Sequence, residues 1–444
     1  MKQIIYTLGM LLFINAGLSA QTINLEQVRN LALANSRSLA QYNMQIQNSI
    51  LNEKNQLYSM LPSISAGYSA SMNYQKNWEL VNPVDTLTAG VTFSITQILF
   101  EGGKSFILKA IYAIATENVR KVALIEYFNV LDSVDNAYYA VLEAAANLEA
   151  AESSLQTAGL IFSIAEIRHT NGIINLGDYL RALADKEARE NSRNQARRNL
   201  ALSMTRLKAL TGLDGTIELE EINFSVYEDV IRRLAGISDK DGDALYSGFL
   251  KILMANNPSL SRAALNIQIA EKNLSIAKRS FSPTVSATIF AAGINYLGAD
   301  RFSNTSSGGV SIRGTIPIDF WVLSNNITKS RISRDSAALD YVSAVSSLET
   351  ELQSALLNTF SQAETVLSSR RTLEYTERHF DYVMERYRLS QSSVSDLGEA
   401  SSLLITSRNN LIRANYGFLQ SLSRLRSLEA HGDEARLLTL LKGD

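Results

Sequence analysis

Strict alternation of polar and apolar side chains begins immediately after Pro62 and runs from Ser63 to Tyr74. Every second residue from Ser63 to Asn73 is small and polar, and the residues between them are mostly apolar. A period of two places the two sets on opposite sides of an extended chain, so the segment predicts a β-strand with two unlike faces. The same alternation recurs in residues 87–96, 285–291 and 310–316, less cleanly past Phe290. The half-exposed sheet of a soluble domain would explain any one of these strands alone.

An apolar face opposite a face rich in serine and threonine is the pattern of a transmembrane barrel with a water-filled lumen. The strand lengths fit the ~9–11 residues that cross a bilayer at a tilt. Tyr74, Trp78 and Tyr296 at the strand ends are candidates for an aromatic girdle. Four strands are too few to close a barrel, and open strand edges are not tolerated in lipid. We therefore expect several chains to share one barrel, and three chains would supply about twelve strands.

The N-terminus predicts export from the cytoplasm. Residues 1–20 contain Lys2, an apolar run and small residues that end at Ala20, which is the pattern of a secretory signal peptide. A buried N-terminal helix is the alternative. No later stretch approaches the ~20 apolar residues of a spanning helix, so a membrane crossing would have to use strands.

Composition narrows the chemistry that the chain can perform. It contains no cysteine, which excludes disulfides, thiolate metal sites, a cysteine nucleophile and lipid attachment through an N-terminal cysteine. An oxidising compartment suits such a chain. The formal net charge of -2 gives no sign of a nucleic-acid partner.

The sequence after the signal peptide is an internal duplication. Residues 35–62 align with residues 256–283, and Ile46-Gln47 matches Ile267-Gln268. Each copy continues with two alternating strands, a long helical stretch, a break and another helix. We expect half-repeats at residues 21–222 and 257–430, a collar-forming linker at 223–256 and a C-terminal tail at 431–444.

Each half-repeat contains a helical stretch with a heptad seam. Residues 104–171 contain no proline, and no glycine before Gly159. At 1.5 Å per residue such a helix is about 100 Å long, far more than a globular core requires. A fibrous coiled coil or a soluble helical bundle would share the seams but would not explain the strands. The seam residues repeat at intervals of three and four: Tyr127, Val130, Val134, Ala137, Val141, Ala144, Leu148, Ala151, Leu155, Ala158, Phe162 and Ala165 in the first copy, and Leu352, Ala355, Thr359, Gln362, Val366, Ser369, Leu373, Thr376, Phe380 and Val383 in the second.

Both long helices are expected to end in tight helix–turn–helix tips, at residues 168–182 and 386–400. Asn171-Gly172 is a plausible C-cap. Asn175 and Ser393 could cap the following helices, which would place Asp178 and Asp396 in the first turn.

The order of these features resembles the outer-membrane efflux protein family, whose best-known member is TolC. The resemblance covers nearly the whole mature chain. It rests on the duplication, Asn256-Asn-Pro-Ser-Leu260, Gln97-Ile-Leu-Phe-Glu-Gly-Gly103 and the Gly172…Asp178 tip. It implies an α+β membrane protein: a trimeric 12-stranded β-barrel, with four strands per chain, that is continuous with a coiled-coil periplasmic tunnel. It also implies partners, namely a periplasmic adaptor protein and an inner-membrane pump of the RND, ABC or MFS type.

The resemblance assigns roles to individual residues. The gate tyrosine of the family matches Tyr387 and its aspartate partner matches Asp178, whereas the gate arginine falls on Ser392, so that link is missing here. Asp396 and Glu399 match an acidic pair that rings the entrance, although the helix dipole equally favours acids in a first turn. The remaining assignments are His169 at the gate, Gly172, Ser390 and Ser392 in the tip turns, and Gln97, Phe100, Gly102 and Gly103 at the barrel–tunnel junction.

The function that we predict is a passive outer-membrane exit duct of a tripartite efflux pump or a type I secretion system. We expect no cofactor and no metal, because His169, His379 and His431 lack ligand-like spacing. Residues 238–243 resemble part of a calcium loop without its closing glutamate, so we expect a surface turn there. The alternatives are a structural or adhesive trimeric coiled-coil surface protein, a periplasmic adaptor and, least favoured, an enzyme.

Overall fold

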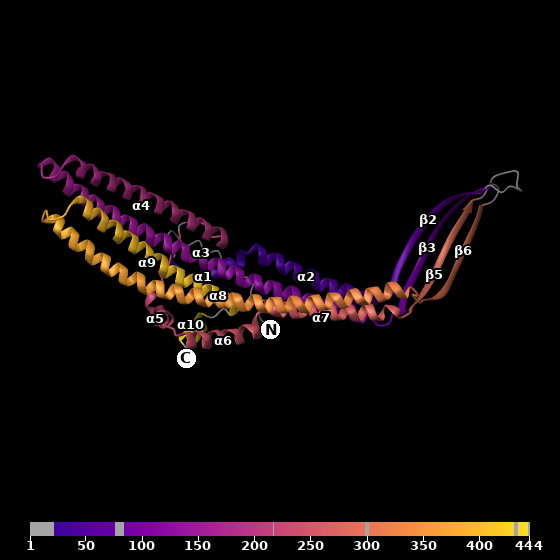
Figure 1. Cartoon of the computed structure of the whole chain (residues 1–444). Helices are drawn as coiled ribbons and strands as arrows, with labels where there is room; N and C mark the ends of the chain where they lie inside the picture. The colour runs from indigo at the N-terminus through magenta and orange to yellow at the C-terminus, as the bar shows by residue number, and fades with distance from the viewer. Residues whose placement is uncertain (1–21, 76–83, 216, 298–301, 430–433, 443–444) are drawn as a thin grey trace. The chain divides into compact units, whose positions relative to one another are not determined.

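Long helices and one four-stranded sheet make up most of the chain (Figure 1). The computed structural model describes residues 22–75, 84–215, 217–297, 302–429 and 434–442. The expected signal peptide (residues 1–20), Trp78 and His431 lie outside the described residues, as do the side chains of Tyr74 and Tyr296. The described elements are β1 (Thr22–Ile23), α1 (Leu25–Asn35), α2 (Arg37–Tyr58), β2 (Ser63–Gln75), β3 (Val84–Phe100), α3 (Lys104–Thr170), α4 (Leu176–Thr211), β4 (Glu218–Leu219), η1 (Phe224–Tyr227), α5 (Glu228–Ala235), α6 (Asp239–Asn256), α7 (Pro258–Lys278), η2 (Arg279–Phe281), β5 (Thr284–Leu297), β6 (Phe302–Thr315), α8 (Phe320–Arg388), α9 (Val394–Glu429) and α10 (Glu434–Lys442).

The chain divides into two compact units. The sheet unit comprises Arg37–Glu126 and Lys251–Glu351. The tip unit comprises Met1–Ser36, Tyr127–Leu250 and Leu352–Asp444. Helices α3, α6 and α8 contribute residues to both units.

The sheet has the strand order β2-β3-β5-β6, and every neighbouring pair is antiparallel. The hairpin of each half-repeat therefore joins the other through β3 and β5. The register aligns Ile64, Ile95, Ile289 and Val310 on one face, and Ser63, Thr96, Thr288 and Ser311 on the other. The alternating segments do form strands with two unlike faces, as predicted.

The apolar face of the sheet leaves large apolar side chains exposed. Tyr68 is 90% exposed and Val310 is 70% exposed, and both lie on the apolar face. Phe290 lies on the polar face, where the register pairs it with Ser94 and Gly309. The missing side chain of Gly309 makes room for the ring, since a Cβ there would lie 3.3 Å from two ring atoms of Phe290.

In the tip unit, α3 and α4 form one helical hairpin and α8 and α9 form the other (Figure 1). The predicted extents of the long helices are confirmed, since α3 ends at Thr170 and α8 ends at Arg388. The seams lie on the covered sides of these helices: Val134, Ala165, Leu352 and Val366 are fully or almost fully buried.

A charged cluster lies where α1, α3 and α9 meet in the tip unit. The carboxylate of Asp135 is completely buried and forms ion pairs with Arg29 (2.6 Å) and with Arg426. The hydroxyl of Ser423 donates to the same carboxylate at 2.8 Å. A buried carboxylate between two guanidinium groups is compensated, so the cluster joins the three helices without an orphaned charge.

Residues 238–243 differ from the expected surface turn. Ser238 instead caps α6, since its Oγ accepts the amide of Asp241 at 3.3 Å, and Asp239 begins the helix. Serine followed by acids in a first turn is a helix-start signal, and that signal outweighs the partial likeness to a calcium loop. The described helices include none that is long and apolar enough to cross a membrane.

Candidate gate at the helix tips

The first tip turn links α3 to α4 through a left-handed glycine. The amide of Gly172 donates to His169 O at 2.9 Å, and the amide of Ile173 donates to Arg168 O at 2.8 Å. These two hydrogen bonds are typical of a helix end at which a residue just after the helix adopts the left-handed conformation. Gly172 is that residue, with φ +74°. Asn175 then caps α4, because its Oδ1 accepts the amide of Asp178 at 2.9 Å.

The second tip turn repeats the same pattern at the same spacing. The amide of Ser390 donates to Tyr387 O at 3.0 Å, and the amide of Gln391 donates to Arg386 O at 2.8 Å. Here a serine with φ +59° takes the left-handed position. The two tips are thus structurally equivalent, with Ser390 in the place of Gly172 and Tyr387 in the place of His169.

Asp396 closes the second tip by capping α9 reciprocally with Ser393. Its Oδ2 accepts the amide of Ser393 at 3.0 Å and the hydroxyl of Ser392 at 3.0 Å, while its own amide donates to Ser393 Oγ at 3.1 Å. The backbone amide of Ser393, helped by the two serine hydroxyls, lowers the pKa of the Asp396 carboxyl below its ordinary value. The exposed Asp396 therefore remains ionised at neutral pH, as an acidic ring would require.

Tyr387 is the buried centre of the tip. It is 1% exposed and belongs to an apolar cluster with Ala165, Val383 and Leu397. Its Oη has no hydrogen-bond partner among the described residues, so the structure does not join it to Asp178 by a hydrogen bond. Burial raises the pKa of the Tyr387 hydroxyl, the guanidinium of Arg168 beside it lowers that pKa in part, and the charge of Asp178 adds a smaller increase. The hydroxyl is therefore a neutral donor at any physiological pH.

Arg168 connects the two tips and was missed by the sequence analysis. Its Nη2 donates to Tyr387 O at 2.7 Å and to Arg388 O at 3.2 Å. Its guanidinium also lies over the Tyr387 ring, 4.4 Å from the ring centroid. The available signal was a basic residue in the last turn of a helix, where arginine satisfies terminal carbonyls.

The other predicted tip residues lie apart from this contact. The His169 ring stacks on Tyr179 with centroids 5.1 Å apart, and its Nδ1 lies 3.3 Å from Ile174 O. Glu399 is exposed on α9 and lines a cavity of about 490 Å³, together with Arg181 and Asp185 of α4.

In the sheet unit, the predicted junction residues form the end of β3 and the turn into α3. The side-chain amide of Gln97 donates to Met60 O at 3.1 Å, and Phe100 is the last, half-exposed residue of the strand. Gly102 and Gly103 both have positive φ. A Cβ on Gly102 would lie 2.5 Å from the Ser282 side chain, so the close approach to the second half-repeat also requires glycine.

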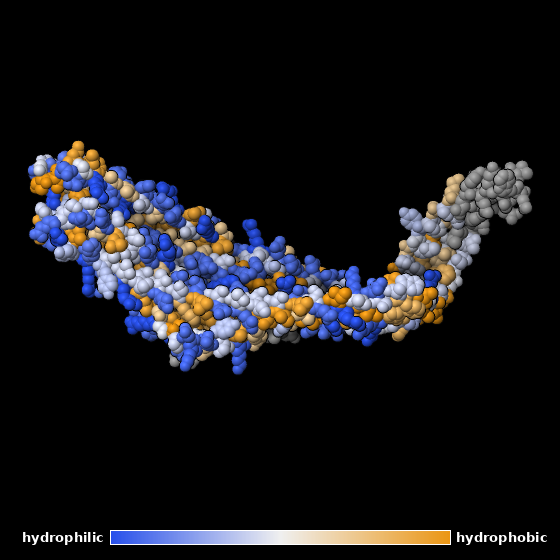
Figure 2. Space-filling view, in the orientation of Figure 1, coloured by the Kyte–Doolittle hydropathy of each residue, from blue (hydrophilic) through white to orange (hydrophobic). Residues whose placement is uncertain are grey.

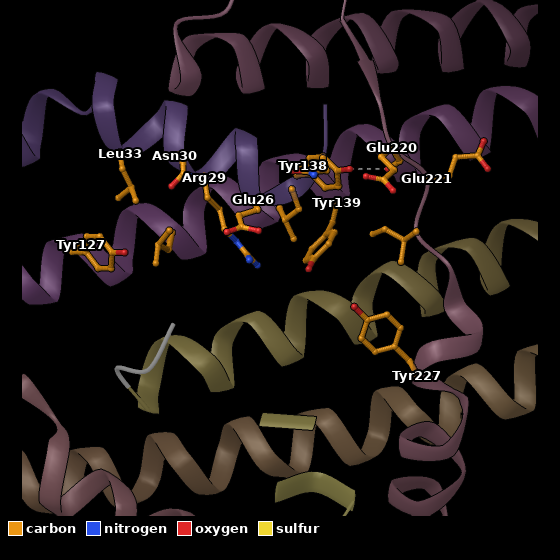
Figure 3. A pocket seen from close by; sticks show the side chains of 14 residues that line it. Glu26, Arg29, Asn30, Leu33, Tyr127, Tyr138, Tyr139, Glu220, Glu221 and Tyr227 are labelled. Carbon is orange, nitrogen blue, oxygen red and sulfur yellow. Dashed lines mark hydrogen bonds between the residues drawn. The ribbon is translucent and has the colours of Figure 1, made fainter. Parts of the chain in front are cut away.

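A second cavity, of about 620 Å³, lies in the tip unit beside α1 and α3 (Figure 3). Its wall includes Glu26, Arg29, Glu220 and Glu221, and Tyr138 Oη donates to Glu220 O at 2.7 Å. Arg29 already pairs with Asp135. Within the described parts of the chain, no group of three or more histidine, cysteine or acidic residues could hold a metal ion.

Comparison with known proteins gives one family. The family model described as outer membrane efflux protein matches residues 28–213 and 250–431. A curated relative, an uncharacterized protein of Haemophilus influenzae, is 27% identical over an alignment of 181 residues, and the match covers 38% of this chain and 37% of the relative. The matched segment thus spans little more than a third of that relative.

Solved structures resemble the chain over almost its whole length. Crystal structures of CusC, reported in connection with transmembrane channel formation, match with a TM-score of 0.75 and 18% identity over 95% of this chain and 96% of that one. The outer-membrane channel OprN gives a TM-score of 0.74 and 16% identity over 92% and 90% of the two chains. The Campylobacter jejuni CmeC outer membrane channel gives 0.70 and 17% over 94% and 89%. At these identities the likeness shows the fold alone.

Proposed function

Because the chain belongs to the outer membrane efflux protein family, whose members are passive channels rather than enzymes, we propose that it forms the exit duct of an export machine in a Gram-negative outer membrane. Three copies would share a barrel of about twelve strands, continuous with a periplasmic tunnel built from the long helices. Substrate would pass down a wet lumen without chemistry by the duct itself.

The observation that carries this proposal is the uncovered apolar face of the sheet. Monomeric soluble proteins rarely expose contiguous apolar patches larger than a few hundred Å². The described apolar face exposes large side chains from all four strands, and lipid contact would account for them: Ile64, Tyr68, Met72, Val91, Phe93, Ile95, Ile289, Val310 and Ile312. The opposite face would then line the lumen, and its Ser65 and Ser94 hydroxyls already pair at 2.7 Å. A purely fibrous coiled coil would not account for this sheet.

The tips would form the periplasmic gate of the duct. We assign Tyr387, Asp178 and His169 to the closing contacts, and exposed Asp396 and Glu399 to acidic rings around a three-fold axis. Like charges in a narrow ring attract cations and repel anions. Opening would be a population shift between packed and splayed hairpins.

Partners of the duct would be a periplasmic adaptor and an inner-membrane pump, which supplies the energy. The first tip offers an apolar surface that an adaptor could cover, and hydrophobic side chains gather at this end of α3 and α4 in Figure 2. Four of its apolar residues are half-exposed or more: Ile167, Ile173, Leu176 and Leu180. An efflux pump and a type I secretion system would use the same kind of duct.

Extraction and accessibility together test the duct. The purified protein should require detergent, run as a trimer and conduct ions in planar bilayers. Because the chain contains no cysteine, single cysteines can be introduced at neighbouring positions on opposite faces, namely Ser69→Cys and Tyr68→Cys. A water-soluble maleimide should label the Ser69→Cys variant and leave its matched control unlabelled in membranes. A water-soluble monomer, or the reverse labelling pattern, would overturn the proposal.

A further inference from the structure

Arg168 is half-buried at the end of α3, yet its hydrogen bonds go to a different hairpin. Both acceptors, Tyr387 O and Arg388 O, belong to the last turn of α8. Carbonyls in the last turn of a helix lack intrahelical donors and accept hydrogen bonds from turn amides or from side chains instead. Tyr387 O already accepts the amide of Ser390, so the bond from Arg168 is the second one to that oxygen. Arg168 supplies two such bonds and covers the ring of the buried Tyr387 at the same time.

The equivalent residue in the second tip behaves differently. Arg386 precedes Ser390 by four residues, as Arg168 precedes Gly172. Its Nη2 donates to Gln391 O at 2.9 Å, which lies in its own tip turn. Its guanidinium lies 5.8 Å from the ring of Tyr382, also on α8. Arg386 therefore closes one turn, whereas Arg168 joins two.

We propose that Arg168 is a positioning residue of the gate: it holds the second tip turn against the first within one protomer and so stabilises the packed state over the splayed state. The inference rests on the proposed duct function. Helix α3 is continuous as far as Thr170, so the first hairpin fixes the position of the Arg168 backbone. Arg168 can therefore keep its hydrogen bonds to α8 only while the two hairpins remain packed together, and this geometry supports the proposal.

Because Arg386 bonds within its own tip turn and Arg168 bonds to the other hairpin, the two arginines provide a matched pair of variants. Arg168→Met removes the hydrogen bonds and the cation while it keeps an apolar stem, and Arg386→Met does the same at the equivalent position. Two hydrogen bonds from a charged group support roughly a tenfold shift in the splayed-to-packed ratio, which corresponds to about 1.4 kcal/mol. In planar bilayers, Arg168→Met should raise the occupancy of the high-conductance state by about that factor, and Arg386→Met should change it less than about twofold.

A second measurement follows the tips without relying on conduction. Thr170→Cys and Leu389→Cys place nitroxide labels on exposed positions beside each turn. Electron–electron double resonance on the purified protein should give a longer and broader distance distribution with Arg168→Met than with Arg386→Met. Arg168→Lys, which keeps the charge but loses the planar fork, should lie between wild type and Arg168→Met.

Equal distances and equal conductance for the two methionine variants would overturn the proposal. A wild-type protein that conducts no ions would refute the duct, while the label distances would still decide whether Arg168 holds the tips together. If Arg168→Met failed to assemble, Arg168→Lys would carry the test, and a lysine variant indistinguishable from wild type in both measurements would overturn the proposal.

Discussion

The two tip turns have the same backbone and different side chains. Each closes its long helix with the same two hydrogen bonds, three and five residues apart. The first uses a left-handed glycine at Gly172, caps α4 with Asn175 and exposes apolar residues around the turn. The second uses Ser390, caps α9 with Ser393 and Asp396, and buries Tyr387. Local hydrogen bonding thus determines the shape of a tip, and the side chains decide whether it is an outer surface or part of a core.

The largest difference between the tips should appear in their response to truncation. Leu397 is fully buried in the tip cluster, and its equivalent in the first tip is the half-buried Tyr179. Leu397→Ala should lower the free energy of unfolding by about 2–5 kcal/mol, because it leaves a cavity. Tyr179→Ala should cost about 1 kcal/mol, mainly the lost stacking on His169. Chemical denaturation of the assembled protein would measure both, and equal costs would refute the distinction between surface and core.

The next largest effect concerns the left-handed position itself. Gly172→Ala should destabilise the first tip by about 1–2 kcal/mol, since a Cβ there meets nothing within 4 Å and only backbone strain remains. Ser390→Gly should stabilise the second tip by up to about 1 kcal/mol, because it relieves the same strain. Hydrogen exchange of the tip amides reports each effect locally. A stabilising Gly172→Ala would show that the turns are not equivalent in solution.

Tyr387→Phe separates packing from gating. The hydroxyl is buried without a hydrogen-bond partner in the described structure, so its removal should change the free energy of unfolding by less than about 0.5 kcal/mol. Conductance in planar bilayers should nevertheless rise, as it should for Asp178→Ala, if both side chains close the proposed gate. Unchanged conductance in both variants would remove that pair from the gate and leave Arg168 as its link.

The smallest effect is an acid dependence of the second tip that arises from Asp396. The folded protein holds the pKa of this carboxyl below its ordinary value of 3.8. The stabilisation is therefore present above that value and is lost as the pH falls through the lower, folded-state pKa. The protection of the amides at the start of α9, measured relative to their intrinsic exchange rates, should decrease below about pH 4. Asp396→Asn should remove this acid dependence, and a variant that kept it would exclude Asp396 as its source.

The sequence predicted the strands and long helices well because their periods are local. Alternation after Pro62 placed the start of β2 at Ser63 and its end within one residue, and the run without proline placed both ends of α3 within one residue. The predicted alternation at residues 310–316 covered only the second half of β6, which begins at Phe302. The pattern fails at Phe290 because its accommodation depends on Gly309 of the neighbouring strand, and that pairing is not encoded in either segment alone.

The tip contacts were harder to predict for a related reason. Arg168 lies off the heptad seam, and its acceptors are backbone carbonyls, which leave no residue-type signal in the sequence. The role expected of Tyr387 depends on its hydroxyl, whereas in the structure its ring and its backbone carbonyl contact Arg168. Contacts between a side chain and the backbone of a helix that is distant in the sequence can be identified only from the three-dimensional structure.

The strand order has one more consequence. Successive antiparallel pairing makes β2 and β6 run in opposite directions, and one comes from each half-repeat. The two outer edges of a copy are therefore different and mutually compatible. Strand β6 of one copy can pair with β2 of the next, and this pairing would also be antiparallel. Such joints are heterologous: they propagate head to tail and end only when the accumulated rotation closes a ring. Strand twist and tilt, rather than a self-complementary patch, would then determine the copy number.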